Sequence, residues 1–197
     1  MESAILLKKQ LFALMKEKAY HEGEIKLASG KTSHYYIDAR AVTLSAQGAY
    51  LVGHIVFDMV REFKVNAAGG PTLGADPIVG ALALVSFQNN LPINTFLIRK
   101  NPKSHGRMLQ VEGPALPAGA DVVLLDDVAT TGGSLVDAIE VLKKMDVGVR
   151  KAIVIVDREE GARENLAKLG CELSSVFKAS EFFSEKYRPA RQQKRSC

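Results

Sequence analysis

The sequence predicts an α/β fold: a doubly wound, mainly parallel sheet flanked by helices, with a small N-terminal hood. Two observations predict it. Short apolar or β-branched runs alternate with segments whose apolar residues recur every three or four positions, as strands and helices do in turn. Several of the short runs are apolar at consecutive positions, which is typical of strands buried on both faces of a parallel sheet. Right-handed crossovers are expected to join them.

The length and composition are sufficient for one domain with a sizeable core, since 47% of the 197 residues are hydrophobic. We expect a single domain over residues 1–185, in which residues 1–40 form the hood and residues 41–185 form the α/β core. Residues 186–197 are expected to be a basic, flexible tail. No internal repeat is visible along the chain.

The helices are predicted from the spacing of apolar residues. The hood begins with a helix that carries Leu7, Leu11 and Leu14 on one side, and its remainder, residues 25–39, mixes polar and aromatic side chains. A second helix starts at Ser45, and its apolar stripe comprises Val52, Ile55, Val56, Met59, Val60 and Phe63.

Two further helices are expected among the strands. Asp76 and Pro77 indicate a helix cap followed by proline in the first turn, and a later helical stripe comprises Leu135, Ile139 and Leu142. The strands themselves are expected at residues 65–70, 94–100, 121–128, 151–158 and 172–177.

Charge and cysteine usage exclude several classes of protein. The formal net charge of +4 is concentrated in a tail without acids, whose cations are Lys186, Arg188, Arg191, Lys194 and Arg195. A general nucleic-acid surface is therefore not expected. Cys171 and Cys197 have no metal-ligand spacing and form no disulfide framework. The apolar runs are too short for a membrane span and the N-terminus lacks the order of a secretory signal, so we expect a cytoplasmic protein.

The strongest functional signal is residues 122–134, a buried strand that ends in two acids and a turn of small residues that opens a helix. A helix N-terminus presents unpaired N–H groups to an anion, glycines allow close approach, and hydroxyls add donors. Asp126 and Asp127 suit the hydroxyls of a ribose. A turn whose Asp and Thr merely cap the helix is the plainer alternative, against which the paired acids weigh. The glycine patterns of nucleoside triphosphatases and dinucleotide-binding folds are absent.

This segment resembles the motif with which type I phosphoribosyltransferases bind phosphoribosyl pyrophosphate (PRPP). The resemblance implies the fold of that family, with Asp126 and Asp127 on the ribose hydroxyls and Asp127 also catalytic. It implies that the remaining PRPP contacts come from Val128, Ala129, Thr130, Thr131, Gly132, Gly133 and Ser134.

A cluster of cations at residues 99–107 follows a predicted strand in a segment with Pro, Gly and no apolar periodicity. Such a loop is suited to close over a departing pyrophosphate, although a solvated basic loop is the usual meaning of a charge run. The spacing resembles the catalytic loop of orotate phosphoribosyltransferases. It implies PRPP contacts from Arg99, Lys100, Lys103 and His105, with Lys103 and His105 catalytic. It also implies a homodimer in which loop 99–110 reaches the neighbouring site.

Residues 27–38 resemble the N-terminal segment of the same family, whose aromatic residues lie beside the base. This implies weaker orotate contacts from Tyr35 and Tyr36, which periodicity alone does not separate from core residues. Many members have Lys immediately before Ser-Gly, whereas Ala28 precedes Ser29 and Gly30 in this chain and Lys26 lies two positions earlier. The role of Lys26 is left open.

A second departure from the family lies in residues 69–77, which resemble its pyrophosphate-side loop. Gly74 stands where some members have Lys. A related branch with Gly-Ala-Asp-Pro reads much like this chain, so we interpret both departures as traits of a subgroup.

Arg158 follows another predicted strand, and its planar guanidinium suits a carboxylate, the group that distinguishes orotate from other bases. From the residues alone, a surface Arg paired with Glu159 or Glu160 is the preferred interpretation. The resemblance reverses that preference, because Asp157-Arg158 matches the orotate-binding Arg of the family and Thr130 matches the other contact.

Together the resemblances imply a magnesium-dependent enzyme that transfers ribose 5-phosphate from PRPP to orotate, with magnesium bound mainly through PRPP. Two alternatives stay open: a salvage phosphoribosyltransferase for another base, and a PRPP-sensing regulator that binds nucleic acid. The first should lack the Asp157-Arg158 pair and the 99–105 loop, and the second needs a DNA-reading domain or a basic face.

Overall fold

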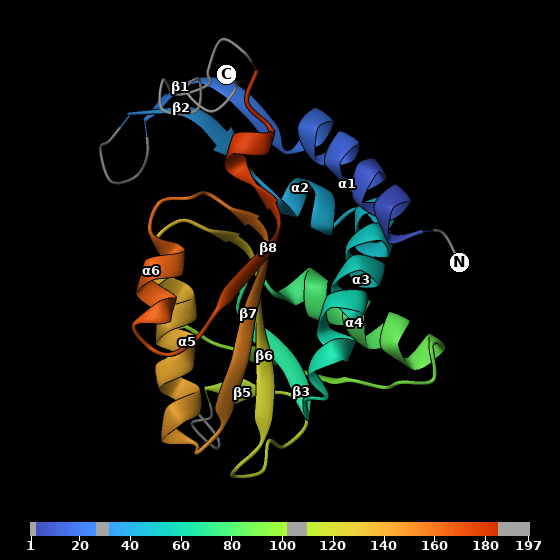
Figure 1. Cartoon of the computed structure of the whole chain (residues 1–197), viewed down its shortest axis with the longest axis vertical. Helices are drawn as coiled ribbons and strands as arrows, with labels where there is room; N and C mark the ends of the chain where they lie inside the picture. Colours follow the sequence, from blue (N-terminus) through green and yellow to red (C-terminus); the bar gives the residue numbers. More distant parts are fainter. Residues whose placement is uncertain (1–2, 27–31, 102–109, 185–197) are drawn as a thin grey trace, which may run out of the picture.

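The computed structural model describes residues 3–26, 32–101 and 110–184. Its centre is a six-stranded sheet in the order β5-β4-β3-β6-β7-β8 (Figure 1). The strands are β3 (Ala67–Pro71), β4 (Asn94–Ile98), β5 (Val111–Glu112), β6 (Asp121–Ala129), β7 (Gly148–Asp157) and β8 (Leu173–Lys178). All neighbours are parallel except β5, which is antiparallel to β4.

The predicted doubly wound, mainly parallel sheet is confirmed, since five of these strands lie where consecutive apolar residues predicted them. Helices cover both faces of the sheet (Figure 1). On β6, Val123 and Leu125 belong to a core shared with α1 (Ala4–Lys18), α3 (Ala46–Val60) and α4 (Asp76–Gln88). Val122 and Leu124 belong to a second core with α5 (Gly133–Lys144) and α6 (Ala162–Ala167). Consecutive apolar residues were needed because the strand is buried on both sides.

Side-chain caps start two of the helices. The Ser45 hydroxyl accepts a hydrogen bond of 3.1 Å from the Gly48 N–H at the start of α3, and the Ser3 hydroxyl accepts one of 3.3 Å from the Leu6 N–H at the start of α1. The predicted capping role of Asp76 is wrong. The turn is already helical at Ala75 (φ −73°, ψ −26°), so Asp76 falls inside the first turn of α4.

The hood consists of α1 and an antiparallel hairpin of β1 (Tyr20–Lys26) and β2 (Thr32–Ile37). The hairpin lies beyond the end of the sheet at which β8 finishes (Figure 1). Aromatic rings join it to the core through Phe182, whose ring stacks on Phe12 at 4.8 Å and lies 5.7 Å from Tyr20. Ser184 donates to Glu22 from both its N–H and its hydroxyl, each at 2.8 Å.

Several short elements were not predicted. They are the hairpin strands, α2 (Arg40–Thr43), β5, α6 and the 3₁₀ turns η1 (Arg61–Phe63) and η2 (Ala179–Glu181). Most are too short to show a period, and β2 shows no apolar alternation because its buried face carries Ser33 and the half-buried Tyr35 beside Ile37. Within the described ranges, no helix has the length and apolar character that crossing a membrane requires.

The close approach of β3 to β6 leads to a first prediction. A Cβ on Gly70 would collide with the backbone oxygen of Leu125, whereas a Cβ on Gly80, an exposed residue within α4, meets nothing within 4 Å. We expect Gly70→Ala to lower the free energy of unfolding by about 3 kcal/mol, because neither backbone has room to yield. The control Gly80→Ala should raise it by about 0.5–1 kcal/mol through helix propensity.

Urea denaturation followed by circular dichroism measures both changes. Equal stabilities for the two variants would show that the contact between β3 and β6 is less tight than the structure indicates.

Candidate active site

Asp126 and Asp127 lie near the carboxyl end of β6 with their side chains turned back onto the backbone. The Asp126 Oδ1 accepts a hydrogen bond of 2.9 Å from the Asp127 N–H, and the Asp127 Oδ1 accepts one of 2.7 Å from the Val128 N–H. Burial raises the pKa of both carboxyls, and for Asp126 the charge of Asp127 raises it further. No cationic side chain in the described part of the chain donates a hydrogen bond to either acid. The pair is therefore suited to accept donors from a ligand.

A cavity of about 260 Å³ opens directly after these acids. It is lined by Asp126, Val128, Ala129, Thr130, Thr131, Gly132, Gly133, Ser134 and Leu135. Gly132 precedes α5 with φ 77°, and the first turn of α5 carries no acidic residue. Three of the lining residues, Thr130, Thr131 and Ser134, carry hydroxyls, and the first turn of α5 has unpaired N–H groups, so the cavity is lined by the donor types that a phosphate needs.

Helix α6 packs against the loop between β6 and α5, which we call the phosphate loop. Asn165 donates from Nδ2 to the carbonyl of Thr131 at 3.0 Å. A Cβ on Gly132 would lie 3.3 Å from that of Ala162, the first residue of α6. The loop is therefore held between β6 and α6, and glycine at position 132 satisfies both the left-handed backbone and the close packing.

The loop that follows β3 folds against the acid pair. A Cβ on Gly74 would lie well inside contact distance of Oδ1 on both Asp126 and Asp127. A larger residue at position 74 would therefore displace the carboxylates, which accounts for the glycine where some family members have lysine. Arg40, ion-paired with Asp38 at 3.4 Å, supplies a nearby positive charge, and its pKa is raised first by Asp38 and also by Asp127.

Arg99 and Lys100 follow β4 and line a cavity of about 170 Å³ together with Pro71, Thr72, Ile98, Gln110, Ser134, Asp137, Ala138 and Val141. The Arg99 N–H donates to the Gln110 carbonyl at 2.8 Å, which anchors the base of the loop, and the Arg99 Nη1 lies 3.7 Å from the Glu112 Oε1. These two cations are thus brought near the first turn of α5. Lys103 and His105 lie outside the described residues.

Arg158 follows β7 and lies beside the phosphate loop, because its N–H donates to the Ala129 carbonyl at 2.9 Å. The Arg158 Nε donates to the Tyr35 hydroxyl at 3.2 Å and to the Glu160 Oε1 at 2.9 Å. The guanidinium carbon lies 4.7 Å from the centre of the Tyr35 ring. Burial is the main cause that raises the pKa of Tyr35, so its hydroxyl stays protonated at neutral pH.

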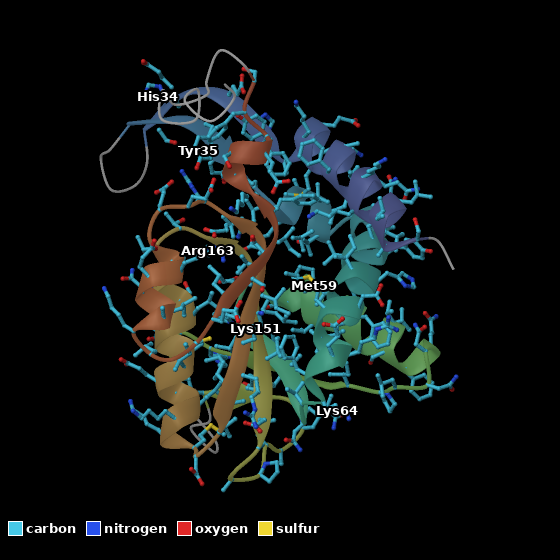
Figure 2. The ribbon with its side chains drawn as sticks, viewed as in Figure 1. His34, Tyr35, Met59, Lys64, Lys151 and Arg163 are labelled. Carbon is cyan, nitrogen blue, oxygen red and sulfur yellow. The ribbon has the colours of Figure 1, made fainter. Side chains whose placement is uncertain are left out.

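The hairpin separates the two predicted tyrosines. Successive side chains of β2 point to opposite faces, so Tyr35 reaches Arg158 whereas Tyr36 is 37% exposed on the other face. Figure 2 shows Tyr35 on the hairpin and Arg163 at the start of α6, both beside the same end of the sheet. The Lys26 side chain, Ala28, Ser29 and Gly30 lie outside the described part, so the open question about Lys26 stays open.

Sequence reasoning missed the residues that hold the Arg158 turn. The Arg163 Nε donates to the Asp157 Oδ2 at 2.8 Å, and its Nη1 donates to the Leu173 carbonyl at 2.8 Å. Asp157 is fully buried. Asp157 and Arg163 are separated by six positions in the sequence, a spacing that carries no signal for such a clamp. Among the described residues, no group of three or more His, Cys, Asp or Glu side chains is arranged to hold a metal ion.

Residues 37–180 match the phosphoribosyl transferase domain family. The orotate phosphoribosyltransferase of Aquifex aeolicus is 43% identical over 180 residues, which cover 90% of this chain and 98% of the relative.

Two solved structures extend the comparison. The orotate phosphoribosyltransferase of Mycobacterium tuberculosis H37Rv in complex with PRPP is 27% identical with a TM-score of 0.74, over 89% of this chain and 98% of the other. The orotate phosphoribosyltransferase from Aeropyrum pernix is 32% identical with a TM-score of 0.68, over 91% and 94%. The fold is therefore shared with these proteins.

The buried acid pair leads to a prediction about stability and pH. A carboxyl whose pKa is raised by folding stabilises the protein below its ordinary value of 3.8, and this stabilisation is lost as the pH rises through the raised pKa. Asp126→Asn removes the charge but keeps an oxygen that accepts from the Asp127 N–H. We therefore expect this variant to be more stable than the wild type at pH 7, with the difference shrinking as the pH falls toward 4.

Urea denaturation at pH 7 and at pH 4 measures the difference. Asp146→Asn, an exposed acid after α5 in the left-handed region that Asn tolerates, is the matched control and should change little. A less stable Asp126→Asn variant at pH 7 would contradict the effect of burial.

Proposed function

The chain belongs to the orotate phosphoribosyltransferase family, and we propose that it transfers ribose 5-phosphate from PRPP to orotate, giving orotidine 5′-monophosphate and pyrophosphate. This is a pentosyl transfer of pyrimidine nucleotide (UMP) biosynthesis. The observation that carries the proposal is the acid pair of β6, with Asp126 buried and Asp127 half-buried, followed at once by a cavity at the N-terminus of α5. Ribose and phosphate recognition are thereby adjacent, as one molecule of PRPP requires.

The residues that we assign to PRPP binding come from the end of β6 and from the loop and first turn that open α5. Asp126 and Asp127 accept hydrogen bonds from the ribose hydroxyls, and residues 128–134 surround the 5-phosphate. As the bond from the anomeric carbon to pyrophosphate breaks, positive charge develops on the ribose, and we assign the stabilisation of that charge to the carboxylate of Asp127. Catalysis by these residues consists of positioning and electrostatics.

The leaving-group side rests on the cations that follow β4. Arg99 and Lys100 neutralise the pyrophosphate from the cavity that they line with Thr72 and Ser134. We assign Lys103 and His105 to the same loop on the basis of the resemblance, with Lys103 acting on the leaving group. Closure of the loop excludes water, which strengthens each of these interactions.

Magnesium is the proposed cofactor. Carboxylate oxygens are ligands that it accepts, and the acid pair of β6 fits a supporting role, but the ion is held mainly through the oxygens of PRPP. When bound, magnesium neutralises the pyrophosphate.

The base side rests on Arg158 and Thr130. The Arg158 guanidinium pairs with the carboxylate of orotate, and the Tyr35 ring packs beside the base. Tyr36 is the weaker assignment, because it lies on the other face of β2. The nitrogen of the orotate ring then forms the new bond to the anomeric carbon while pyrophosphate departs.

The assembly and location of the chain are part of the proposal. Loop 99–110 is expected to reach the site of a neighbouring copy, as in the family it resembles, so the proposed state is a homodimer. The proposed location is the cytoplasm.

The test of the proposed function is a substrate comparison. Orotate consumption is followed by its ultraviolet absorbance with PRPP and magnesium, pyrophosphate release is measured in parallel, and uracil, hypoxanthine and guanine are run as rivals. We expect equal amounts of orotate lost and pyrophosphate released. Turnover with another base alone would indicate a salvage enzyme, and PRPP binding without any turnover would indicate a regulator.

A further prediction concerns the cationic loop. Lys103→Ala should lower the turnover number by about a hundredfold or more, because a charge aimed at the departing pyrophosphate acts mainly in the transition state. The affinity for PRPP, measured by titration calorimetry, should change much less. Lys144→Ala, an exposed lysine at the end of α5, is the control and should behave as the wild type does. An unchanged turnover number in Lys103→Ala would count against the assignment.

A further inference from the structure

Arg158 is held through one of its three nitrogens. Its side-chain hydrogen bonds to the described residues, to the Glu160 Oε1 at 2.9 Å and to the Tyr35 hydroxyl at 3.2 Å, are both donated by Nε. The side chain is only 9% exposed and the guanidinium lies over the Tyr35 ring. Within the described part of the chain, the two terminal nitrogens have no hydrogen-bond partner. Their planar edge is therefore the part of Arg158 that remains for a ligand.

We propose that Glu160 is a positioning residue for base recognition, which fixes the Arg158 Nε so that the two terminal nitrogens face the carboxylate of the base. The inference rests on the proposed function. A guanidinium binds a carboxylate through two parallel N–H groups only when its plane has the right orientation. A fixed Nε sets that plane in advance, which lowers the cost of ordering the side chain when the base binds.

Tyr35 completes a closed set of hydrogen bonds with these two residues. Its hydroxyl accepts from the Arg158 Nε and donates to the Glu160 Oε1 at 3.4 Å. The raised pKa of Tyr35 keeps the proton that this arrangement needs.

The adjacent Glu159 does something different, although it has the same side chain. Its N–H donates to the Asp157 Oδ1 at 2.8 Å, and its Oε2 accepts from the Ser180 N–H at 3.3 Å. Glu159 adopts φ 60°, and this turn sends the two glutamates in different directions. Glu159 therefore ties the turn to η2, whereas Glu160 acts on Arg158, which makes Glu159 a matched control.

The experiment compares Glu160→Ala, Glu160→Gln and Glu159→Gln in the full chain by steady-state kinetics with orotate and PRPP. Glu160→Ala should raise the KM for orotate roughly ten- to a hundredfold, as expected for the loss of a hydrogen bond to a charged group. The KM for PRPP should stay within about twofold, because no PRPP contact passes through this residue. Glu160→Gln keeps an oxygen for Nε and should restore the KM for orotate to within about threefold of the wild type.

The selectivity for orotate over uracil, measured as a ratio of kcat/KM, should fall in Glu160→Ala and remain unchanged in Glu159→Gln.

The proposal is overturned if Glu160→Ala behaves like Glu159→Gln, or if the KM values for orotate and for PRPP rise together. It is also overturned if Glu160→Gln is as impaired as Glu160→Ala, or if Glu160→Ala binds orotate more tightly, since Glu160 would then act by charge or compete with the base. Glu160 is 41% exposed, so folding is not at risk. A wild type without orotate turnover contradicts the proposed function, whereas an active wild type with an unaffected Glu160→Ala contradicts only this inference.

Discussion

The parallel pairing of β6 with β7 brings the two halves of the candidate site together. Ala129 lies opposite Asp157 in the register, so both strands end at the same level. The Arg158 N–H then donates to the Ala129 carbonyl, which places the turn after β7 beside the phosphate loop after β6. Both strands are buried on both faces, so polar residues concentrate where the strands end. The phosphate loop and the Arg158 turn are thereby held next to each other.

Short connections then hold the two turns in place. Helix α6 follows the Arg158 turn and contacts both sides: Arg163 pairs with the buried Asp157, and Asn165 donates to the Thr131 carbonyl in the phosphate loop. A six-residue helix thus links the part of the site assigned to the base with the part assigned to the phosphate. This link fits an enzyme that must hold both reactants at a fixed separation.

The acid pair shows that the site is arranged for binding at some expense of stability. Burial raises the pKa of Asp126 and Asp127, which means that folding disfavours their charged forms. The chain retains them although an apolar end to β6 would pack without this cost. The loop after β3 adapts to them, since only glycine at position 74 leaves both carboxylates where they are. The presence of Gly74, where some family members have lysine, therefore has a steric cause.

The sequence by itself determined the sheet, the long helices and the motif of residues 122–134, because burial on two faces and a strand-to-helix turn each leave a pattern within a few consecutive residues. It did not determine the hairpin, because the buried face of β2 carries the polar Ser33 and so shows no apolar alternation, or which of Tyr35 and Tyr36 meets Arg158. For Arg158 the residues alone favoured pairing with Glu159 or Glu160, and the structure does show the pair with Glu160. Only the tertiary structure decided that this pair also meets Tyr35, 123 positions away from Arg158. Contacts between residues so distant depend on how the strand ends and the hood come together, and no local pattern encodes that arrangement.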